Sequence, residues 1–443
     1  MTASSAQRRI AQLATLTAVH RAFHWLHLHQ PQLRQWLFEI VRIPAPPFGE
    51  AARAAWFLER FQQLGLANIH LDDAGNVLAE LASNSETISS NEADNSPRLQ
   101  SNTSAPSDPL VSEKSAVAPV VLLSAHLDTV FPAGTSTEPT EAKNSPRIHA
   151  PGICDNAAGL TGLLAIAAAL GHAKIAPPIP ILFAANVGEE GEGDLRGMRH
   201  LFEHGPYRTL ISAAIALEGS GASAVVTRAL GSLRFRVTIT GPGGHSWADA
   251  GTLNPILLLS QALTRIAALP LPTDPLTTIN VGHISGGTSI NSIPESATAL
   301  IDIRSTSSAQ LTATAAALHR IFDETVTPNT TQKTATPPKL HIETIGNRPA
   351  AALPDDSPLL HTLRAVDRHL TLRTELRLGS TDANIPLSRG IPAIAIGAGG
   401  QGGGIHTLQE WYDPTGRETA LRRILLTLLD TIATVQTTNP NTA

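Results

Sequence analysis

Hydrophobic residues recur at intervals of three and four in the first part of the chain, from about residue 6 to residue 66. This period predicts amphipathic helices, and the segment IPAPPFGE at 43–50 breaks the pattern. A short pair of strands is predicted between residues 68 and 81. From residue 83 to residue 115, Ser, Asn, Glu, Thr and Pro replace the large apolar residues, so we expect a disordered surface insertion there.

Short, continuous apolar runs follow this segment and alternate with helical stretches. The runs VVLLSAH, IPILFAANV and SAAIALEGS read as strands, and NAAGLTGLLAIAAALGH reads as a helix. Later, IPAIAIGAG predicts another strand, and residues 416–435 predict a closing helix. Continuous apolarity is typical of strands buried on both faces. We therefore expect an α/β domain with a mostly parallel mixed sheet and helices on both faces.

A different pattern begins at LRFRVTITG, where apolar and polar residues alternate. The predicted order of elements there is β-α-β-β-α-β, which is the order of a ferredoxin-like α+β domain. We expect this domain to be inserted at residues 229–346. The first domain would then consist of two segments, residues 1–228 and 347–443.

Composition narrows the class of protein. A chain of 443 residues exceeds the usual size of one hydrophobic core, so two domains are expected. The net charge of -5 provides no broad basic field, so nucleic acid is not an expected partner. The start of the chain lacks the apolar core of a secretory signal, and we found no uninterrupted apolar run of about 18 residues to cross a membrane. The single cysteine, Cys154, fits a reducing compartment, and we expect a cytoplasmic protein.

Five residues are candidate metal ligands, and each stands just after a predicted strand or at a helix start. His126 ends one strand, with Asp128 two residues further on, Asp155 begins a helix, and Glu190 follows another strand beside Glu189. Each has an ordinary alternative: a polar strand end, a helix cap, or a solvated charge run. In the pair of adjacent glutamates, one could bind a metal while the other moves protons.

Two further candidates complete the set. Glu218 ends the apolar run AAIALEGSG, where it could be a ligand or part of a buried salt bridge. His406 follows a glycine-rich stretch whose spacing does not match a phosphate-binding loop, so we interpret it as a loop that carries one histidine. Carboxylates combined with imidazoles suit zinc, or cobalt or manganese in its place. Two such ions with a shared carboxylate could activate a water and stabilise a tetrahedral intermediate.

Several motifs in one order resemble a known family. They are SAHLDTV, GICDNAAG, NVGEEGEGDLRGMR, ALEGSG, GPGGHSWAD, INVGHISGGTSINSIPESATALIDIRS, GSTDANIP and GGGIHTLQEW, and they span residues 122–413. The family is that of the dinuclear zinc peptidases and deacylases, which includes peptidase T, carboxypeptidase G, aminoacylase-1 and succinyl-diaminopimelate desuccinylase.

The resemblance implies two Zn²⁺ ions with Asp155 bridging them. His126 and Glu218 would complete one site, and Glu190 and His406 would complete the other.

The resemblance also implies the remaining roles. Asp128 would orient His126, and Glu189 would be the general base that takes a proton from a metal-bridging water or hydroxide and passes it to the leaving amine. The inserted domain would act as a lid and as the contact of a homodimer, with His245 stabilising the oxyanion. The residues that would bind substrate are Asn280, Arg304, Ser380 and Thr381.

The substrate class stays open between two amides. The segment NVGEEGEGDLRGMR is closer to peptidase T, which favours a short peptide and an exopeptidase or dipeptidase. Glu218 stands where peptidase-T-like enzymes are expected to have Asp, which favours an N-acyl-amino-acid amidohydrolase. An alternative of another class is a catalytically silent scaffold that binds peptides or dimerises.

Overall fold

The computed structural model describes residues 3–83, 118–327 and 337–438. The predicted disordered insertion therefore lies, except for its first residue, outside the described residues. Two compact units make up the chain, and each is described by itself. Unit 1 comprises Met1–Val225, Leu353–Leu376 and Gly390–Ala443, and unit 2 comprises Val226–Ala352 and Arg377–Arg389.

Unit 2 contains a separate segment that we expected in the other domain, Arg377–Arg389, and its main segment extends a few residues past the expected bounds, to Val226 and Ala352. The amide nitrogen of the Asn384 side chain donates to the carbonyl oxygens of Leu230 (2.9 Å) and Pro349 (3.0 Å), at the two ends of the inserted region. These hydrogen bonds join residues far apart in the sequence, and hydrophobic periodicity contains no signal for them.

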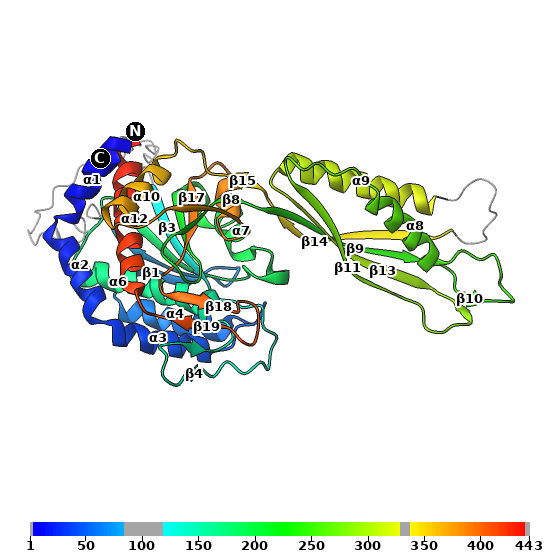
Figure 1. The fold of residues 1–443 in the computed structure, drawn as a ribbon, viewed down its shortest axis with the longest axis horizontal. Helices are drawn as coiled ribbons and strands as arrows, with labels where there is room; N and C mark the ends of the chain where they lie inside the picture. The colour runs from blue at the N-terminus through cyan, green and yellow to red at the C-terminus, as the bar shows by residue number, and fades with distance from the viewer. Residues whose placement is uncertain (1–2, 84–117, 328–336, 439–443) are drawn as a thin grey trace, which may run out of the picture. The chain divides into compact units, whose positions relative to one another are not determined.

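Helices cover much of unit 1 (Figure 1). They are α1 (Ala3–Ala14), α2 (Thr17–Leu28), α3 (Gln30–Arg42), α4 (Ala51–Gln63), α6 (Gly159–Ala173), α7 (Arg196–Glu203), α10 (Pro358–His369) and α12 (Arg417–Thr438), with the short turns η1 (Ile153–Ala158), η2 (Gly191–Gly193) and η3 (Pro206–Thr209). The predicted N-terminal helical region is thus four helices. The predicted closing helix is α12, to which α1 is tied by an ion pair between Arg9 Nε and Asp430 Oδ1 at 2.7 Å.

A mostly parallel sheet forms the centre of unit 1. Its strands are β1 (Ala67–Leu71), β2 (Val77–Leu81), β3 (Val120–His126), β6 (Ile181–Asn186), β7 (Ile211–Leu217) and β17 (Ala393–Ile396), in the spatial order β1-β2-β6-β3-β7-β17. The pairs from β6 to β17 are parallel, and β1 and β2 join antiparallel. All seven residues of β3 are buried, as its continuous apolar run predicted. The predicted α/β class with a mostly parallel mixed sheet is confirmed.

A second, small sheet of unit 1 lies along the chain segments that flank the candidate site. It has the order β18 (Gln401–Gly403), β19 (Trp411–Asp413), β5 (Ile148–His149) and β4 (Thr140–Glu141). Tyr412 pairs with Ile148 in this sheet, so the segment that leads to Asp155 lies beside the segment that follows His406.

One helical segment among the described residues, Ile153–Ala173, is long and apolar enough to cross a membrane by length and composition, with a mean hydropathy of 1.6. Its apolar window is entirely buried inside the protein. It comprises η1 and α6, and α6 contacts α2, α3 and the strands β3, β6 and β7. This environment is that of a core helix.

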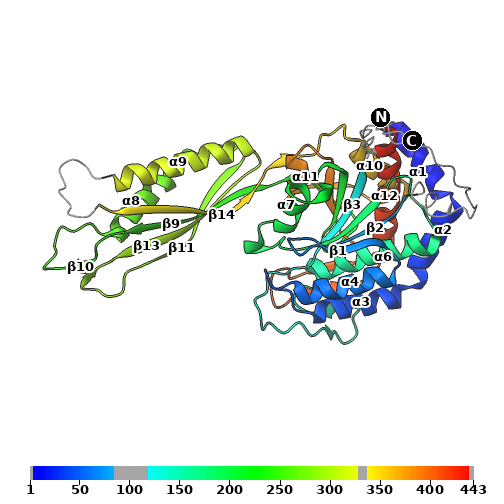
Figure 2. The same cartoon turned by 180° about the vertical axis from the view of Figure 1, so that it is seen from behind.

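Unit 2 has the predicted β-α-β-β-α-β order (Figure 2). Its main elements are β9 (Gly231–Thr240), α8 (Pro255–Ala267), β11 (Thr277–Gly286), β13 (Ser296–Ser305), α9 (Ser308–Val326) and β14 (Lys339–Arg348). The antiparallel sheet has the order β11-β13-β9-β14. Buried and partly exposed residues alternate along β13, and apolar residues of both helices pack on the buried side.

Shorter elements complete unit 2. They are β8 (Ala224–Ala229), which crosses its boundary, β10 (Gly244–His245), β12 (Ser292–Ile293), β15 (Ala351–Ala352), β16 (Glu375–Gly379), also at the boundary, and α11 (Asn384–Ser388). β10, which ends at His245, pairs with β12 antiparallel.

Candidate metal centre

Polar side chains gather where the parallel strands of unit 1 end. His126 is the last residue of β3, Glu218 follows the last residue of β7, and Glu189 and Glu190 follow β6 after a two-residue link. Parallel strands bring their carboxyl ends to one edge of a sheet, which is where open α/β sheets bind ligands. Residues from distant parts of the sequence therefore meet at this edge.

Asp155 lies at the centre of this arrangement. Its Oδ1 is 3.1 Å from Nε2 of His126, and its Oδ2 is 3.2 Å from Nε2 of His406. Glu218 Oε1 lies 3.3 Å from the same nitrogen of His126, and Glu190 Oε1 lies 2.8 Å from that of His406. The two oxygens of one carboxylate thus face two different histidine and glutamate pairs.

These contacts define two groups that share a residue. The groups are His126, Asp155 and Glu218, and Asp155, Glu190 and His406, and in each the potential ligand atoms lie within 4.8 Å of one another. Zinc binds nitrogen and oxygen ligands at roughly 2.0–2.2 Å, so two ligands of a tetrahedral ion are about 3.4 Å apart. The separations around Asp155 are close to this value, and the mixed imidazole and carboxylate donors suit a divalent cation. The five residues predicted as ligands fit two cations.

The adjacent glutamates lie on a tightly turned segment. Gly188 and Gly191, which flank them, have φ angles of 66° and 51°, in the left-handed region that favours glycine. Both glutamates are buried. Glu189 also belongs to a third group of possible ligands, with His126 and Glu190, so the geometry brings it to the cluster together with the five predicted ligands.

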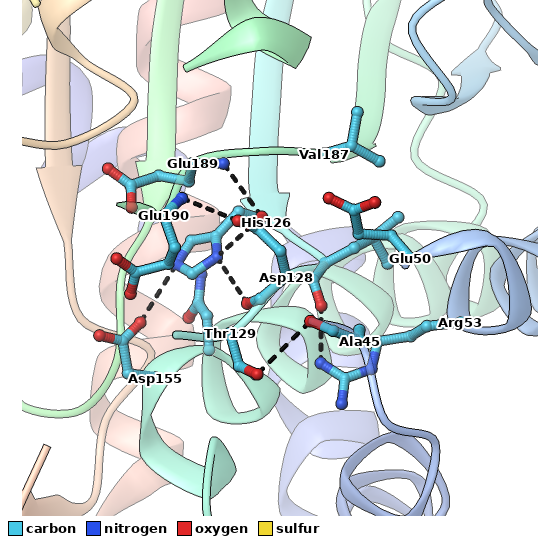
Figure 3. A network of polar contacts seen from close by, with 12 residues as sticks. Ala45, Glu50, Arg53, His126, Asp128, Thr129, Asp155, Val187, Glu189 and Glu190 are labelled. Carbon is cyan, nitrogen blue, oxygen red and sulfur yellow. Dashed lines mark hydrogen bonds and ion pairs between the residues drawn. The ribbon is translucent and has the colours of Figure 1, made fainter. Parts of the chain in front are cut away.

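Asp128 connects the first strand to this glutamate segment (Figure 3). Its Oδ1 accepts a hydrogen bond from the backbone nitrogen of Glu189 at 3.0 Å, and its Oδ2 accepts one from that of Glu190 at 2.7 Å. The nearest partner of His126 Nδ1 is the backbone oxygen of Asp128, at 3.1 Å, whereas the carboxylate Oδ1 is at 3.5 Å. Asp128 therefore lies beside the ring of His126, and it also holds the two glutamates in place, which was not predicted from the sequence.

The carboxylates and histidines of the cluster shift one another's pKa values. Although burial alone would lower the pKa of His126, the negative charges of Glu218, Asp128 and Asp155 raise it well above its usual value. Hydrogen bonds to Asp155 and Glu190 raise the pKa of His406 to about 10. Burial would raise the pKa of Asp155, but the two histidines hold it well below its usual range. A bound cation would take over the role of these ring protons, because a histidine must be neutral to bind a metal.

Two buried residues position the segments that carry the candidate ligands, and neither was predicted from the sequence. Glu410 accepts hydrogen bonds from the backbone nitrogens of Gly152, Cys154 and Asp155, each at 2.8 Å. Burial raises the pKa of Glu410 to about 7, against the effect of these three donors. Glu410 is four residues from His406, so it links the segments that carry two of the candidate ligands.

Asn156 plays a similar part beside Glu218. Its side-chain nitrogen donates to the carbonyl oxygen of Leu217 at 2.9 Å, and its side-chain oxygen accepts from the backbone nitrogen of Gly219 at 3.0 Å. The residues on both sides of Glu218 are therefore bound to the neighbour of Asp155. The only signal in the sequence was the position of Asn156 next to a candidate ligand.

Three predicted residues lie on the sheet or loops of unit 2. His245 is exposed, and its Nδ1 accepts from the backbone nitrogens of Trp247 and Ala248, both at 3.2 Å. Asn280 on β11 lies opposite Asp302 on β13, and Arg304 Nε donates to Asp302 Oδ2 at 2.7 Å. Asn280 and Arg304 therefore share one face of the sheet, where part of the Arg304 guanidinium is already bonded.

Ser380 and Thr381, the other predicted substrate-binding residues, precede α11 in unit 2. Ser380 Oγ accepts from Nη1 of Arg348 at 3.1 Å. Thr381 is buried, its nitrogen donates to Asn384 Oδ1 at 2.9 Å, and its Oγ1 accepts from the nitrogen of Ala383 at 3.2 Å. These contacts stabilise the start of a helix.

Comparisons with known proteins identify the fold and the family. A probable carboxypeptidase of Ajellomyces capsulatus is 28% identical over 202 residues, which cover 42% of this chain and 45% of that relative, so the match spans less than half of its length. The fold is shared with aminopeptidase PepT from Bacillus cereus (TM-score 0.66, 19% identity, 91% of this chain and 99% of that one). It is also shared with the YXEP protein of Bacillus subtilis, a dinuclear metal-binding peptidase (TM-score 0.62, 14% identity, 91% and 98%). The model of peptidase family M20/M25/M40 matches residues 122–433, which is more than half of the chain, and the chain therefore belongs to this family.

Proposed function

We propose that this protein is a two-metal hydrolase that cleaves the amide bond of short peptides, as an exopeptidase or dipeptidase. The observation that carries the proposal is the position of Asp155, whose two oxygens face His126 and His406 separately. The names of its relatives, a carboxypeptidase, an aminopeptidase and a dinuclear metal-binding peptidase, support a peptide substrate.

The proposed ligands are His126, Asp155 and Glu218 for one cation and Asp155, Glu190 and His406 for the other. The donor chemistry fits two Zn²⁺ ions, with Co²⁺ or Mn²⁺ as possible substitutes. Bound cations of this kind lower the pKa of a water and polarise the carbonyl that it attacks.

Glu189 is the proposed general base. Its carboxylate belongs to a group with His126 and Glu190. Its backbone nitrogen donates a hydrogen bond to Asp128, which holds the backbone of residue 189 in position beside the proposed ligands. A carboxylate in this position can take a proton from the attacking water and give it to the leaving amine. Because Glu189 is buried, little water surrounds it, and its electrostatic interactions with the reacting groups are therefore stronger.

We also propose that unit 2 acts as a lid and as the contact of a homodimer. The strand β11 lies at one edge of its sheet and exposes Val281 and Ile284, so that its backbone could pair with the same strand of a second copy. A monomeric mass of the native protein in light scattering would exclude the dimer.

His245 is the proposed oxyanion donor on this lid. Because its Nδ1 accepts two backbone hydrogen bonds, the ring proton of the neutral form is on Nε2, where it can be donated. The backbone nitrogen of His245 is also bound to Asp249 Oδ2 at 2.7 Å, which fixes the base of the side chain.

We predict that His245→Ala lowers kcat about 100-fold or more, the typical effect of removing an oxyanion donor, while the metal content stays unchanged. Steady-state kinetics and elemental analysis of the purified variant measure both quantities. His341→Ala, a change of another lid histidine on β14, is the matched control. A kcat for His245→Ala equal to that of the control would remove His245 from the mechanism.

A substrate panel tests the proposed function. The protein, loaded with Zn²⁺, Co²⁺ or Mn²⁺, is assayed with dipeptides, tripeptides and N-acetyl and N-succinyl amino acids. We expect turnover of the peptides. Turnover of the acylated amino acids alone would favour the amidohydrolase that Glu218 suggests, and a protein that binds no transition metal and hydrolyses none of these amides would be a scaffold.

A further inference from the structure

Arg53 is a fully buried arginine on α4, in the N-terminal part of the chain that precedes the family match at residues 122–433. A buried guanidinium is costly unless its charge and its donors are compensated. Arg53 is therefore expected to have a specific reason for its position.

The hydrogen bonds of Arg53 go to backbone oxygens on two segments. Its Nε and Nη2 donate to the carbonyl oxygen of Ile43 at 3.0 Å and 2.5 Å. Its Nη1 donates to the carbonyl oxygen of Leu127 at 2.6 Å. Within the part of the chain that the structure describes, no carboxylate accepts a hydrogen bond from Arg53, so its charge is compensated at longer range.

Asp128 supplies part of that compensation. Burial lowers the pKa of Arg53 to about 10, and the negative charge of Asp128 opposes this shift, so the guanidinium stays charged at neutral pH. Asp128 is itself fully buried and is bound to the nitrogens of Glu189 and Glu190. The charge of Arg53 thus acts on the carboxylate that holds the glutamate segment.

The contact with Leu127 lies between two residues of the candidate site. Leu127 is preceded by His126 and followed by Asp128, and its nitrogen donates to Asn186 O at 2.6 Å. Thr129 supports the same turn, because its nitrogen donates to the carbonyl oxygen of Ala45 at 2.9 Å. Its Oγ1 donates to the same oxygen at 3.4 Å (Figure 3). The segment that carries His126 and Asp128 is therefore held against the loop before α4, with Arg53 as the charged link.

We propose that Arg53 is a positioning residue of the metal centre. It fixes the Leu127 peptide, and with it His126, and it places a permanent positive charge near Asp128, which orders Glu189 and Glu190. This proposal rests on the proposed function, since it assigns Arg53 to the same site. Arg53 is not one of the proposed ligands, and it acts through these neighbours.

Two substitutions test this role without the need for catalysis. Arg53→Lys keeps the charge but cannot bridge the two carbonyl oxygens with a planar fork. Arg53→Gln removes the charge, is easier to bury, and keeps an amide donor for one carbonyl oxygen. We expect each variant to bind Co²⁺ about 10–100-fold more weakly than the wild type, which is the usual effect of losing a residue that orients metal ligands. Calorimetric titration gives the affinity, and the visible spectrum of bound Co²⁺ reports the altered ligand geometry.

Arg423 provides a matched control. It is equally buried in unit 1, but it pairs with Asp367 through Nε at 2.6 Å and Nη2 at 2.8 Å, away from the proposed ligands in the hydrogen-bond network. Arg423→Lys should lower the melting temperature yet leave Co²⁺ affinity and spectrum as in the wild type.

In the Arg53 variants we also expect kcat to fall with little change in KM.

The outcomes separate the two proposals. Wild-type protein that binds no Co²⁺ would overturn the proposed function itself. If the wild type binds two equivalents and both Arg53 variants bind Co²⁺ with wild-type affinity and spectrum, Arg53 has only a structural role. Equal losses of affinity in the Arg53 and Arg423 variants would also reject the proposal, because the effect would then follow stability.

Discussion

Changing Glu189 to glutamine is expected to lower kcat by roughly 10²–10⁴-fold, the range by which general acid–base catalysis accelerates a reaction. Glutamine has nearly the same shape as glutamate but cannot accept the proton of an attacking water. The backbone nitrogen of residue 189 keeps its bond to Asp128, so the segment should hold its position. Steady-state kinetics with the preferred peptide and elemental analysis of metal content measure the two parts of this prediction, a large loss of kcat and an unchanged content of two equivalents.

The matched control is Glu192→Gln. Glu192 is an exposed carboxylate three residues further along, and it belongs to none of the ligand groups found among the described residues. We expect it to retain wild-type kcat and metal content. Because Glu189 also forms a group with His126 and Glu190, loss of one metal equivalent from Glu189→Gln would make it a ligand and refute its assignment as the base.

The fold could be predicted because burial leaves a direct trace in the sequence. A strand with both faces covered, such as β3, must be apolar at every position, whereas a strand with one face covered, such as β13, alternates. The burial of Ile153–Ala173 is consistent with the same rule, since a helix surrounded by protein is apolar on all sides. The segment Arg377–Arg389 belongs to unit 2 and contacts residues far away in the sequence, as in the hydrogen bonds of Asn384 and Gly379 with Leu230, and no such pattern predicts these contacts.

His126 and Glu218 could be singled out for a related reason, since a polar residue that ends an apolar strand needs a partner. The full set of candidate ligands came from the family resemblance. The residues that position these ligands could not be predicted from the sequence. Glu410 acts on a backbone nitrogen 255 positions away, and Arg53 acts on a carbonyl oxygen 74 positions away. Such contacts depend on the three-dimensional path of the chain rather than on residue type, because any backbone can supply the nitrogen or the oxygen. Buried charged residues that bind only backbone are thus found from structures.

Changing Asp155 to alanine is expected to remove both metal ions, because each oxygen of this carboxylate faces a different group of ligands. Several kcal/mol of transition-state stabilisation by metals would be lost with them, which corresponds to at least about a 10³-fold fall in kcat/KM. Elemental analysis after dialysis should find less than one equivalent per chain. Calorimetric titration with Zn²⁺ should show both remaining affinities reduced by more than about 100-fold, beyond the usual effect of a residue outside the ligand set.

The controls are changes of ligands that belong to one group only. Glu218→Ala leaves Asp155, Glu190 and His406 intact, and His406→Ala leaves the group of His126 and Glu218 intact. Each should therefore keep about one tightly bound equivalent, and this difference in stoichiometry separates a shared carboxylate from a general disturbance of the cluster. If Asp155→Ala instead retains one tight equivalent, as these two variants do, the carboxylate serves a single cation and does not bridge. If all three variants lose both equivalents, the groups do not bind independently, and the sharing by Asp155 no longer explains the loss.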